Sequence, residues 1–210
     1  QLVSLKEVAI DMPAGPSEVE VIADESANPA FIAADFLSQA EHGVDSQAML
    51  VTASESIVEP IMQAIREQLD RLPRKEITEK SLSHSRLIVL KDKQEVIDFT
   101  NLYAPEHLII QTTDYADIAG QVENAGSVFM GSYTPESAGD YASGTNHTLP
   151  TNGYAKAYSG VNLDSFIKKI TFQEITADGI RLLGGTIRTM AANEQLDAHK
   201  NAVTIRLNTL

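Results

Sequence analysis

The feature that most restricts the fold is an alternation of short apolar runs with amphipathic segments along the first part of the chain. The apolar runs predict strands, because they are rich in β-branched residues and end at turn-forming residues. The predicted strands are residues 19–23, 48–52, 86–90, 107–111 and 127–130, and the predicted helices between them are residues 28–43, 54–72, 93–103 and 115–124. Strands that are apolar throughout are typical of a parallel sheet covered by helices on both faces. We therefore expect an α/β fold with an open, mostly parallel sheet.

The alternation stops at a long polar segment, residues 131–160, which is rich in Gly, Ser, Thr, Asn, Pro and Tyr. A loop of this length inside a compact domain is usually functional or disordered, and its tyrosines and scarce charges favour an ordered, functional loop. After it, residues 164–175 and 176–192 have amphipathic patterns, and a final segment begins at residue 195. Open α/β sheets bind ligands beyond the carboxyl ends of their strands, so we expect the ligand site there.

Composition limits the partners. The chain has 16 basic and 29 acidic side chains and a formal net charge of -13. This balance argues against nucleic acid and against anionic membranes, because both need a basic surface. The longest apolar stretches are too short to span a bilayer. There is no cysteine, so any metal must be held through nitrogen and oxygen, and we expect a reducing, cytoplasmic location.

Gln39 and His42 lie at the end of the first predicted helix. Positions three apart share a helix face, so the two side chains could converge on one ligand, and an amide with an imidazole could form half of a zinc site. The alternative is a polar helix end at which His42 interacts with the helix dipole. Spacing alone favours the alternative.

Glu106 and His107 enter a predicted strand after Pro105. An adjacent carboxylate and imidazole could supply two proton acceptors for general-base catalysis. Neighbouring strand residues point to opposite faces, so cooperation between them needs a turn, which Pro105 favours. The alternative is a surface carboxylate beside a half-buried imidazole.

Further polar residues lie in loops and segment ends. In the long loop, flanking glycines free the backbone to present Asp140 or His147, although Asp140 could equally make an Asx turn. Ser17 follows a tight Gly–Pro turn and could face a ligand or cap that turn. Glu194 and His199 do not share a helix face, but a break near Leu196 could align them.

Taken together, motifs along the whole chain resemble those of histidinol dehydrogenase, and they occur in that family's order. The motifs are Asp11–Val19 (DMPAGPSEV), Leu37–Gly43 (LSQAEHG), Tyr103–Leu108 (YAPEHL), Ser137–His147 (SAGDYASGTNH) and Glu194–His199 (EQLDAH). The resemblance is to the C-terminal half of that enzyme, with most of the dinucleotide-binding part missing.

The resemblance implies NAD-dependent oxidation of L-histidinol to L-histidine through L-histidinaldehyde, the last steps of histidine biosynthesis. It implies that Zn2+ is held by Gln39, His42, Asp140 and His199. It implies that Glu106 and His107 are the catalytic acid–base pair. Substrate contacts would come from Ser17, Glu194, His107 and the zinc ligands. It also implies a homodimer in which the segment carrying Glu194 and His199 reaches the neighbouring subunit's site. The cofactor-binding residues for NAD are expected mostly outside this chain.

These expectations divide the chain into three parts. Residues 1–18 would be the trailing edge of the missing dinucleotide-binding domain, residues 19–160 an incomplete Rossmann-like domain with the zinc and catalytic residues, and residues 161–210 a helical dimerisation tail. We expect such a fragment to have little activity alone. One alternative is a non-catalytic, zinc-binding dimeric module derived from that enzyme. The other is a zinc hydrolase with Glu106 as base, which requires an open coordination position on the metal and the absence of a nicotinamide site.

Overall fold

The structure is a computed structural model that describes residues 10, 12, 13 and 15–210. The chain forms two compact units, residues 1–166 and 167–210. The boundary between the units lies six residues after the expected start of the C-terminal part. Most of the expected opening segment, residues 1–18, lies outside the described residues, and Glu18 already belongs to the first strand.

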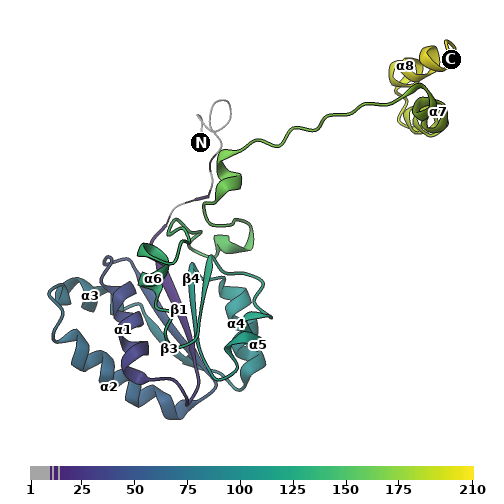
Figure 1. The fold of residues 1–210 in the computed structure, drawn as a ribbon. Coiled ribbons are helices and arrows are strands. Elements are labelled where there is room, and N and C mark those ends of the chain that lie inside the picture. Colours follow the sequence, from purple (N-terminus) through teal and green to yellow (C-terminus); the bar gives the residue numbers. More distant parts are fainter. Residues whose placement is uncertain (1–9, 11, 14) are drawn as a thin grey trace. The chain divides into compact units, whose positions relative to one another are not determined.

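The first unit contains one sheet of parallel strands in the order β3-β2-β1-β4-β5 (Figure 1). The strands are β1 (Glu18–Ala23), β2 (Gln47–Thr52), β3 (Arg86–Val89), β4 (His107–Gln111) and β5 (Ser127–Met130). All four neighbouring pairs run parallel. The predicted open parallel sheet is therefore confirmed. In the register of the central pair, Val19 lies opposite His107.

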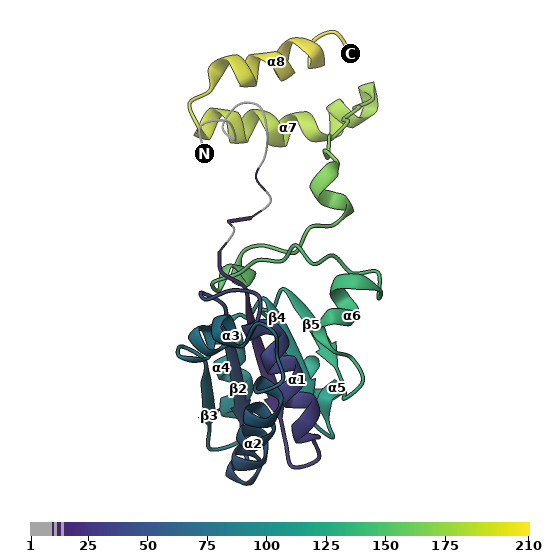
Figure 2. The same ribbon diagram turned by 90° about the vertical axis from the view of Figure 1, so that its left-hand side faces the viewer.

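Helices cover both faces of the sheet (Figures 1 and 2). One face carries α1 (Pro29–Ala40), α2 (Val58–Leu69) and α3 (Lys75–Leu82), and the other carries α4 (Lys93–Tyr103) and α5 (Tyr115–Ala119). Two separate apolar cores result. Val21 and Ile109 belong to the first core, with Phe36 of α1, whereas Ile22 and Ile110 belong to the second. Alternate strand residues thus point to opposite, equally apolar layers, as the sequence pattern indicates.

Local sequence explains where the helices begin. The Asn28 side chain accepts a hydrogen bond from the Ala30 N–H and caps α1, and Pro29 follows at the first helical position, where a missing N–H costs nothing. Asp92 caps α4 by accepting from the Glu95 N–H. Helix α4 ends at Ala104, which has a left-handed φ of 56°, and the chain then turns into β4.

The structure differs from the sequence prediction in several segments. The helix expected over residues 54–72 is a short 3-10 turn (Glu55–Ile57) followed by α2, and α3 after it was not predicted. Helix α5 stops before Gly120, well short of residue 124. The long loop contains α6 (Glu136–Tyr141) and a 3-10 turn (Tyr154–Lys156).

The amphipathic pattern of residues 164–175 does not form the expected helix. Only a 3-10 turn (Leu163–Phe166) is present there, and the residues that follow are extended with exposed apolar side chains. An amphipathic pattern produces a stable helix only when its apolar face packs against something, and within the described residues Ile170 and Phe172 stay 71% and 92% exposed.

The second unit is a helical hairpin of α7 (Ala177–Asn193) and α8 (Asp197–Leu207). Thr176 caps α7 by accepting from the Gly179 N–H. The chain reverses at Gln195, whose φ is +61°, so the break expected near Leu196 is present. Among the described residues, no helix is long and apolar enough to cross a membrane.

Candidate functional site

The predicted site residues of the first unit gather at the amino ends of the strands. Ser17 precedes β1, Glu106 precedes β4, and Gln39 lies in the last turn of α1, which runs back against the strand direction. The expectation that the site lies beyond the carboxyl ends is therefore wrong for these residues. The physical reason is the direction of α1, whose C-terminal end is delivered to the amino edge of the parallel sheet.

Glu106 and His107 act as one group because Glu106 lies in the turn before β4. Its Oε2 is 3.6 Å from His107 Nδ1, and both side chains are almost completely buried. In a regular strand two successive side chains would point to opposite faces. The turn expected after Pro105 is present and brings the two groups together, so the alternative of an exposed carboxylate does not hold.

Ser17 connects this pair to α1. Its Oγ donates to Glu106 Oε2 at 2.6 Å and lies 3.3 Å from Gln39 Oε1. Gln39 is completely buried, and its Nε2 has no hydrogen-bond partner in the part of the chain that the structure describes. A buried amide without a partner is costly, so Gln39 is placed to meet a group that enters the site.

The hydrogen bonding of His107 defines which ring nitrogen is available. His107 Nδ1 lies 3.2 Å from the backbone oxygen of Glu18, which can only accept. The proton of a neutral ring therefore belongs on Nδ1, and the lone pair belongs on Nε2. His107 Nε2 is buried and has no partner among the described residues. The ring thus presents a free, basic nitrogen to the site.

Burial adjusts both members of the pair toward neutral forms. The pKa of Glu106 is raised to about 7, mainly by desolvation and also by the Asp140 carboxylate, despite the opposing hydrogen bonds from Ser17 and the Glu18 N–H. Desolvation lowers the pKa of His107, which keeps the imidazole uncharged at neutral pH. An acid near neutrality beside an uncharged imidazole suits proton transfer in both directions.

The structure adds three buried carboxyl groups that the sequence analysis did not select. They are Glu18, Asp35 and Glu136, and burial is the largest cause that raises their pKa values to about 7, about 7 and about 8. Sequence signals for two of them existed. Glu18 starts an apolar strand, and Asp35 lies four positions before Gln39 on the same face of α1.

His42 and Asp140 face this cluster from two sides. His42 follows the C-cap of α1, and its Nε2 lies 4.0 Å from Glu136 Oε1. The charge of Asp140 in α6 acts on Glu106, His107 and Glu136. Gln39 and His42 therefore share a neighbourhood as expected, although His42 lies beyond the regular helix.

The residues suit a cation bound through nitrogen and oxygen. Within the part of the chain that the structure describes, no three His, Cys, Asp or Glu side chains are arranged to hold a metal. Of the four expected ligands, Gln39 is an amide, and His199 belongs to the second unit. Among the described residues, Glu136 Oε2 is buried without a hydrogen-bond partner, so the cluster contains an oxygen acceptor that is not used within it. The donor chemistry of Gln39, His42 and Asp140 therefore fits zinc.

Glu194 and His199 belong to the second unit. Glu194 is the C-cap of α7, and His199 lies in the first turn of α8, both exposed. They flank the reversal at Gln195, so they are close in the chain's path without sharing a helix face. Their expected roles stay predictions.

Two glycines allow close backbone approaches around the site. A side chain at Gly126 would place its Cβ 2.5 Å from the Glu106 backbone oxygen. A side chain at Gly15 would lie 2.2 Å from the Asn152 amide nitrogen and 2.7 Å from Thr151 Oγ1. The structure assigns no turn at residues 15–17, unlike the sequence expectation, and the absence of a side chain at Gly15 lets Thr151 and Asn152 of the long loop pack directly before β1.

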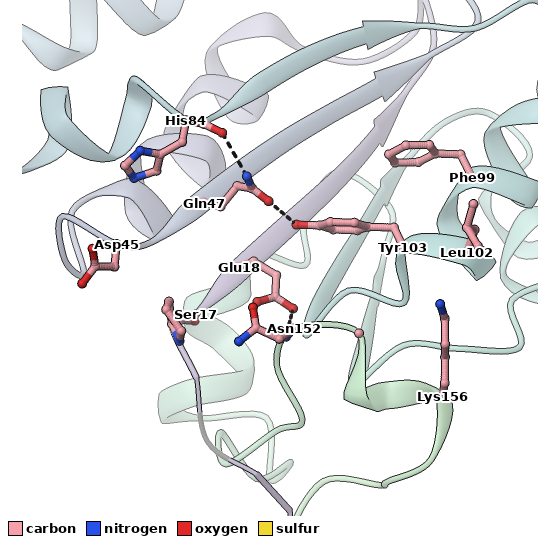
Figure 3. A pocket seen from close by; sticks show the side chains of 12 residues that line it. Ser17, Glu18, Asp45, Gln47, His84, Phe99, Leu102, Tyr103, Asn152 and Lys156 are labelled. Atoms are coloured by element: carbon pink, nitrogen blue, oxygen red, sulfur yellow. Dashed lines mark hydrogen bonds between the residues drawn. The ribbon is translucent and has the colours of Figure 1, made fainter.

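A cavity of about 650 Å³ adjoins the cluster on the α4 side of the sheet (Figure 3). Ser17 and Glu18 form its border with the acid–base pair. Tyr103 donates to Gln47 Oε1 at 2.7 Å inside it, and Lys156 lies at its opposite side (Figure 3). Ser17 and Glu18 therefore separate the buried acid–base pair from an open, polar space.

Comparisons with known proteins agree on one family. A family model described as histidinol dehydrogenase matches residues 1–207. Histidinol dehydrogenase of Bacteroides thetaiotaomicron is 70% identical over 210 residues, which are 100% of this chain and 49% of that protein. The chloroplastic histidinol dehydrogenase of Arabidopsis thaliana is 59% identical over 204 residues, 97% of this chain and 44% of that protein.

The crystal structure of histidinol dehydrogenase from Elizabethkingia anophelis matches with a TM-score of 0.96 and 57% identity, and covers 99% of this chain and 48% of that chain. The chain thus spans about half the length of the curated relatives it matches. These shares give a length and not a position, so the expected placement in the C-terminal half is not borne out by the comparisons.

Proposed function

Because the chain belongs to the histidinol dehydrogenase family, we propose that it carries the zinc, substrate and acid–base groups for the NAD-dependent oxidation of L-histidinol to L-histidine. The observation that carries this proposal is His107 Nε2, a buried nitrogen beside Glu106 for which the described residues provide no hydrogen-bond partner. A base and an acid of near-neutral pKa at one point suit a reaction that releases a proton and then activates water.

His107 is the base of the first oxidation. The Glu18 carbonyl holds the Nδ1 proton, so Nε2 takes the proton of the histidinol hydroxyl group. Loss of that proton prepares the carbinol carbon to release a hydride, which NAD would accept when bound. The product is the aldehyde, and the imidazole is left as its cation. NAD supplies the electron acceptor, one molecule in each of two oxidations.

Glu106 is the base of the second oxidation. As a carboxylate it takes a proton from a water molecule that attacks the aldehyde carbon, which gives the hydrated aldehyde. Once its first proton has passed to solvent, His107 takes a hydroxyl proton of this hydrate, whose second hydride NAD would accept. The carboxylic acid that results releases its own proton to solvent and becomes the carboxylate of histidine. The hydrogen bonds from Ser17 and from the Glu18 N–H hold Glu106 Oε2 in place for this proton transfer.

Gln39, His42 and Asp140 would hold zinc in the first unit, with His199 as the fourth ligand. Zinc would anchor and polarise the amino alcohol without redox chemistry of its own. The carboxyl groups of Glu18, Glu136 and Asp140 interact electrostatically with Glu106 or its surroundings, and such a cluster favours a cationic ligand; histidinol is an amino compound. Ser17 and Glu194 are proposed as further substrate contacts.

We propose a homodimer that shares its active sites, in which Glu194 and His199 come from the neighbouring subunit. The second unit supports this, because its apolar surface is largely uncovered: Leu182 is 82% exposed and Met190 59%. Few of its apolar residues are buried, and a helical hairpin of this size is marginal alone. A cytoplasmic location is also proposed, from the absence of cysteine.

The test is histidinol binding by calorimetry, with zinc present and again after chelation. Binding that needs zinc is expected for the wild-type chain. It is expected to fall at least tenfold in Asp140→Asn, which loses a charged ligand. The exposed Asp98→Asn is the matched control and should bind like the wild type. Equal histidinol affinity with and without zinc would contradict the proposed site.

Turnover separates the enzyme from the alternative, a zinc-binding dimeric module without catalysis. Since the expected NAD-binding residues lie outside this chain, we expect the purified chain to form little NADH from histidinol. Strong NADH formation by the chain alone would contradict this. If Glu106→Gln and His107→Gln left histidinol affinity unchanged while Glu194→Gln reduced it, affinity alone would not distinguish the module from the enzyme.

A further inference from the structure

Glu18 occupies a singular position in the first unit. It is the first residue of β1, it is 5% exposed, and it lies between the acid–base pair and the cavity. An ionisable side chain is rarely buried at the start of a central strand unless its oxygens are used. The contacts of Glu18 show how they are used.

Glu18 is the first residue of β1 and Glu106 immediately precedes the neighbouring strand β4, and the two residues exchange hydrogen bonds reciprocally. The Glu18 N–H donates to Glu106 Oε2 at 3.1 Å, and the Glu106 N–H donates to Glu18 Oε1 at 3.3 Å. Each carboxyl group thus accepts the other residue's backbone N–H. This exchange fixes the Glu106 side chain relative to β1.

The same Glu18 Oε1 also accepts the Asn152 N–H at 2.9 Å, as Figure 3 shows. Asn152 adopts a left-handed φ of 54° and lies in the same long loop as Asp140. Meanwhile the Glu18 carbonyl accepts from His107 Nδ1. Glu18 therefore contacts Glu106, His107 and Asn152 of the long loop.

We propose that Glu18 is a positioning residue of this site, which clamps Glu106, His107 and residue 152 together through its carboxyl group and its backbone. Glu18 itself does not touch the reacting atoms. The clamp makes the order of the long loop and the geometry of the acid–base pair interdependent. This inference rests on the proposed function for its meaning, but its test needs neither turnover nor substrate.

The test uses the 210-residue chain and nuclear magnetic resonance. Glu18→Asp keeps the charge but withdraws the oxygens by one methylene, and Glu18→Ala removes them. In both, we expect the amide hydrogens of Glu106 and Asn152 to exchange roughly tenfold faster, because each loses a buried hydrogen bond that opposes opening. We also expect the ring nitrogen shifts of His107 to show less of the Nδ1-protonated tautomer.

Glu18→Gln is the rescue variant, because its amide oxygen can still accept both N–H groups, and it should keep exchange rates close to the wild type. Glu20→Gln is the matched control. Glu20 lies two residues on, on the same face of β1, completely buried, but its carboxyl group accepts from Thr100 Oγ1. It should leave all three signals unchanged.

Exchange rates in Glu18→Asp within twofold of the wild type would overturn the clamp. So would an equal acceleration in Glu20→Gln, because the effect would then be a general loss of stability. If Glu18→Ala does not fold, Glu18→Asp against Glu18→Gln decides alone. A failed histidinol measurement would affect the proposed function and leave these signals as they are.

Discussion

At the scale of single residues, the site depends on backbone atoms as much as on side chains. The Glu18 carbonyl selects the tautomer of His107, and two N–H groups hold carboxyl oxygens. Such contacts fail when the backbone shifts by a few tenths of an ångström. Positions where only glycine fits are therefore sensitive tests of the site.

Gly126→Ala is such a test. Its Cβ would lie 2.5 Å from the Glu106 backbone oxygen, so the turn before β4 must move. We expect a loss of about 1–3 kcal/mol in the free energy of unfolding and weaker histidinol binding. Urea unfolding measures the first and calorimetry the second. Gly43→Ala is the control, because its Cβ would meet only Ser46 Oγ, at 4.0 Å. Equal behaviour of the two variants would contradict the close approach.

At the scale of elements, the ends of helices and strands place the chemistry. Ser17, Glu18 and Glu106 lie where β1 and β4 begin, and His42 lies where α1 ends. In the second unit, α7 and α8 form a hairpin in which Gly184 of α7 lies close to Leu207 of α8.

Gly184 and Gly185 offer a matched comparison within one helix. A Cβ at Gly184 would lie 2.8 Å from Leu207 Cδ1, whereas one at Gly185 would meet nothing within 4 Å. We expect Gly185→Ala to stabilise the helix by about 1 kcal/mol, because alanine is the better helix former. Gly184→Ala gains the same propensity but must displace Leu207. Thermal unfolding followed by circular dichroism should therefore rank Gly185→Ala above Gly184→Ala, and the reverse order would contradict this packing of α7 on α8.

At the scale of the whole molecule, the chain stores several carboxyl groups in a neutral, buried form. Glu20 is the case outside the site: burial raises its pKa to about 8 from 4.5, against the hydrogen bond from Thr100. The pKa values of Glu18, Glu106 and Glu136 are raised in the same direction. An acid that is more easily protonated in the folded state stabilises the fold most at low pH.

We therefore expect stability to fall as pH rises. The contribution of Glu20 is fully present below about pH 4.5 and is lost as pH approaches and passes through about 8, since the unfolded chain then binds fewer protons than the folded one. Urea midpoints at pH 5 to 8, measured in chelator, should decrease. Glu20→Gln should flatten the decrease, while the exposed Asp98→Asn should not. A midpoint that rises over this range would contradict the raised pKa values.

The sequence by itself determined the class of the fold. The apolar runs at residues 19–23 and 107–111 have no polar face, and only a sheet covered on both sides can bury them. The sequence also determined the family, because the motifs can be recognised from residue identity and order alone. Caps such as Asn28 and Asp92 are local, and so helix starts followed from them.

Only the tertiary structure decided which edge of the sheet holds the site, because that depends on the direction in which α1 returns. It also decided that Glu106 and His107 share one pocket, and that residues 167–175 are extended for want of a packing partner. The sequence could not predict that acids such as Glu136 are buried, since burial depends on residues distant in the chain. Local patterns report local geometry, whereas solvent exclusion and contacts between distant segments exist only once the chain has folded.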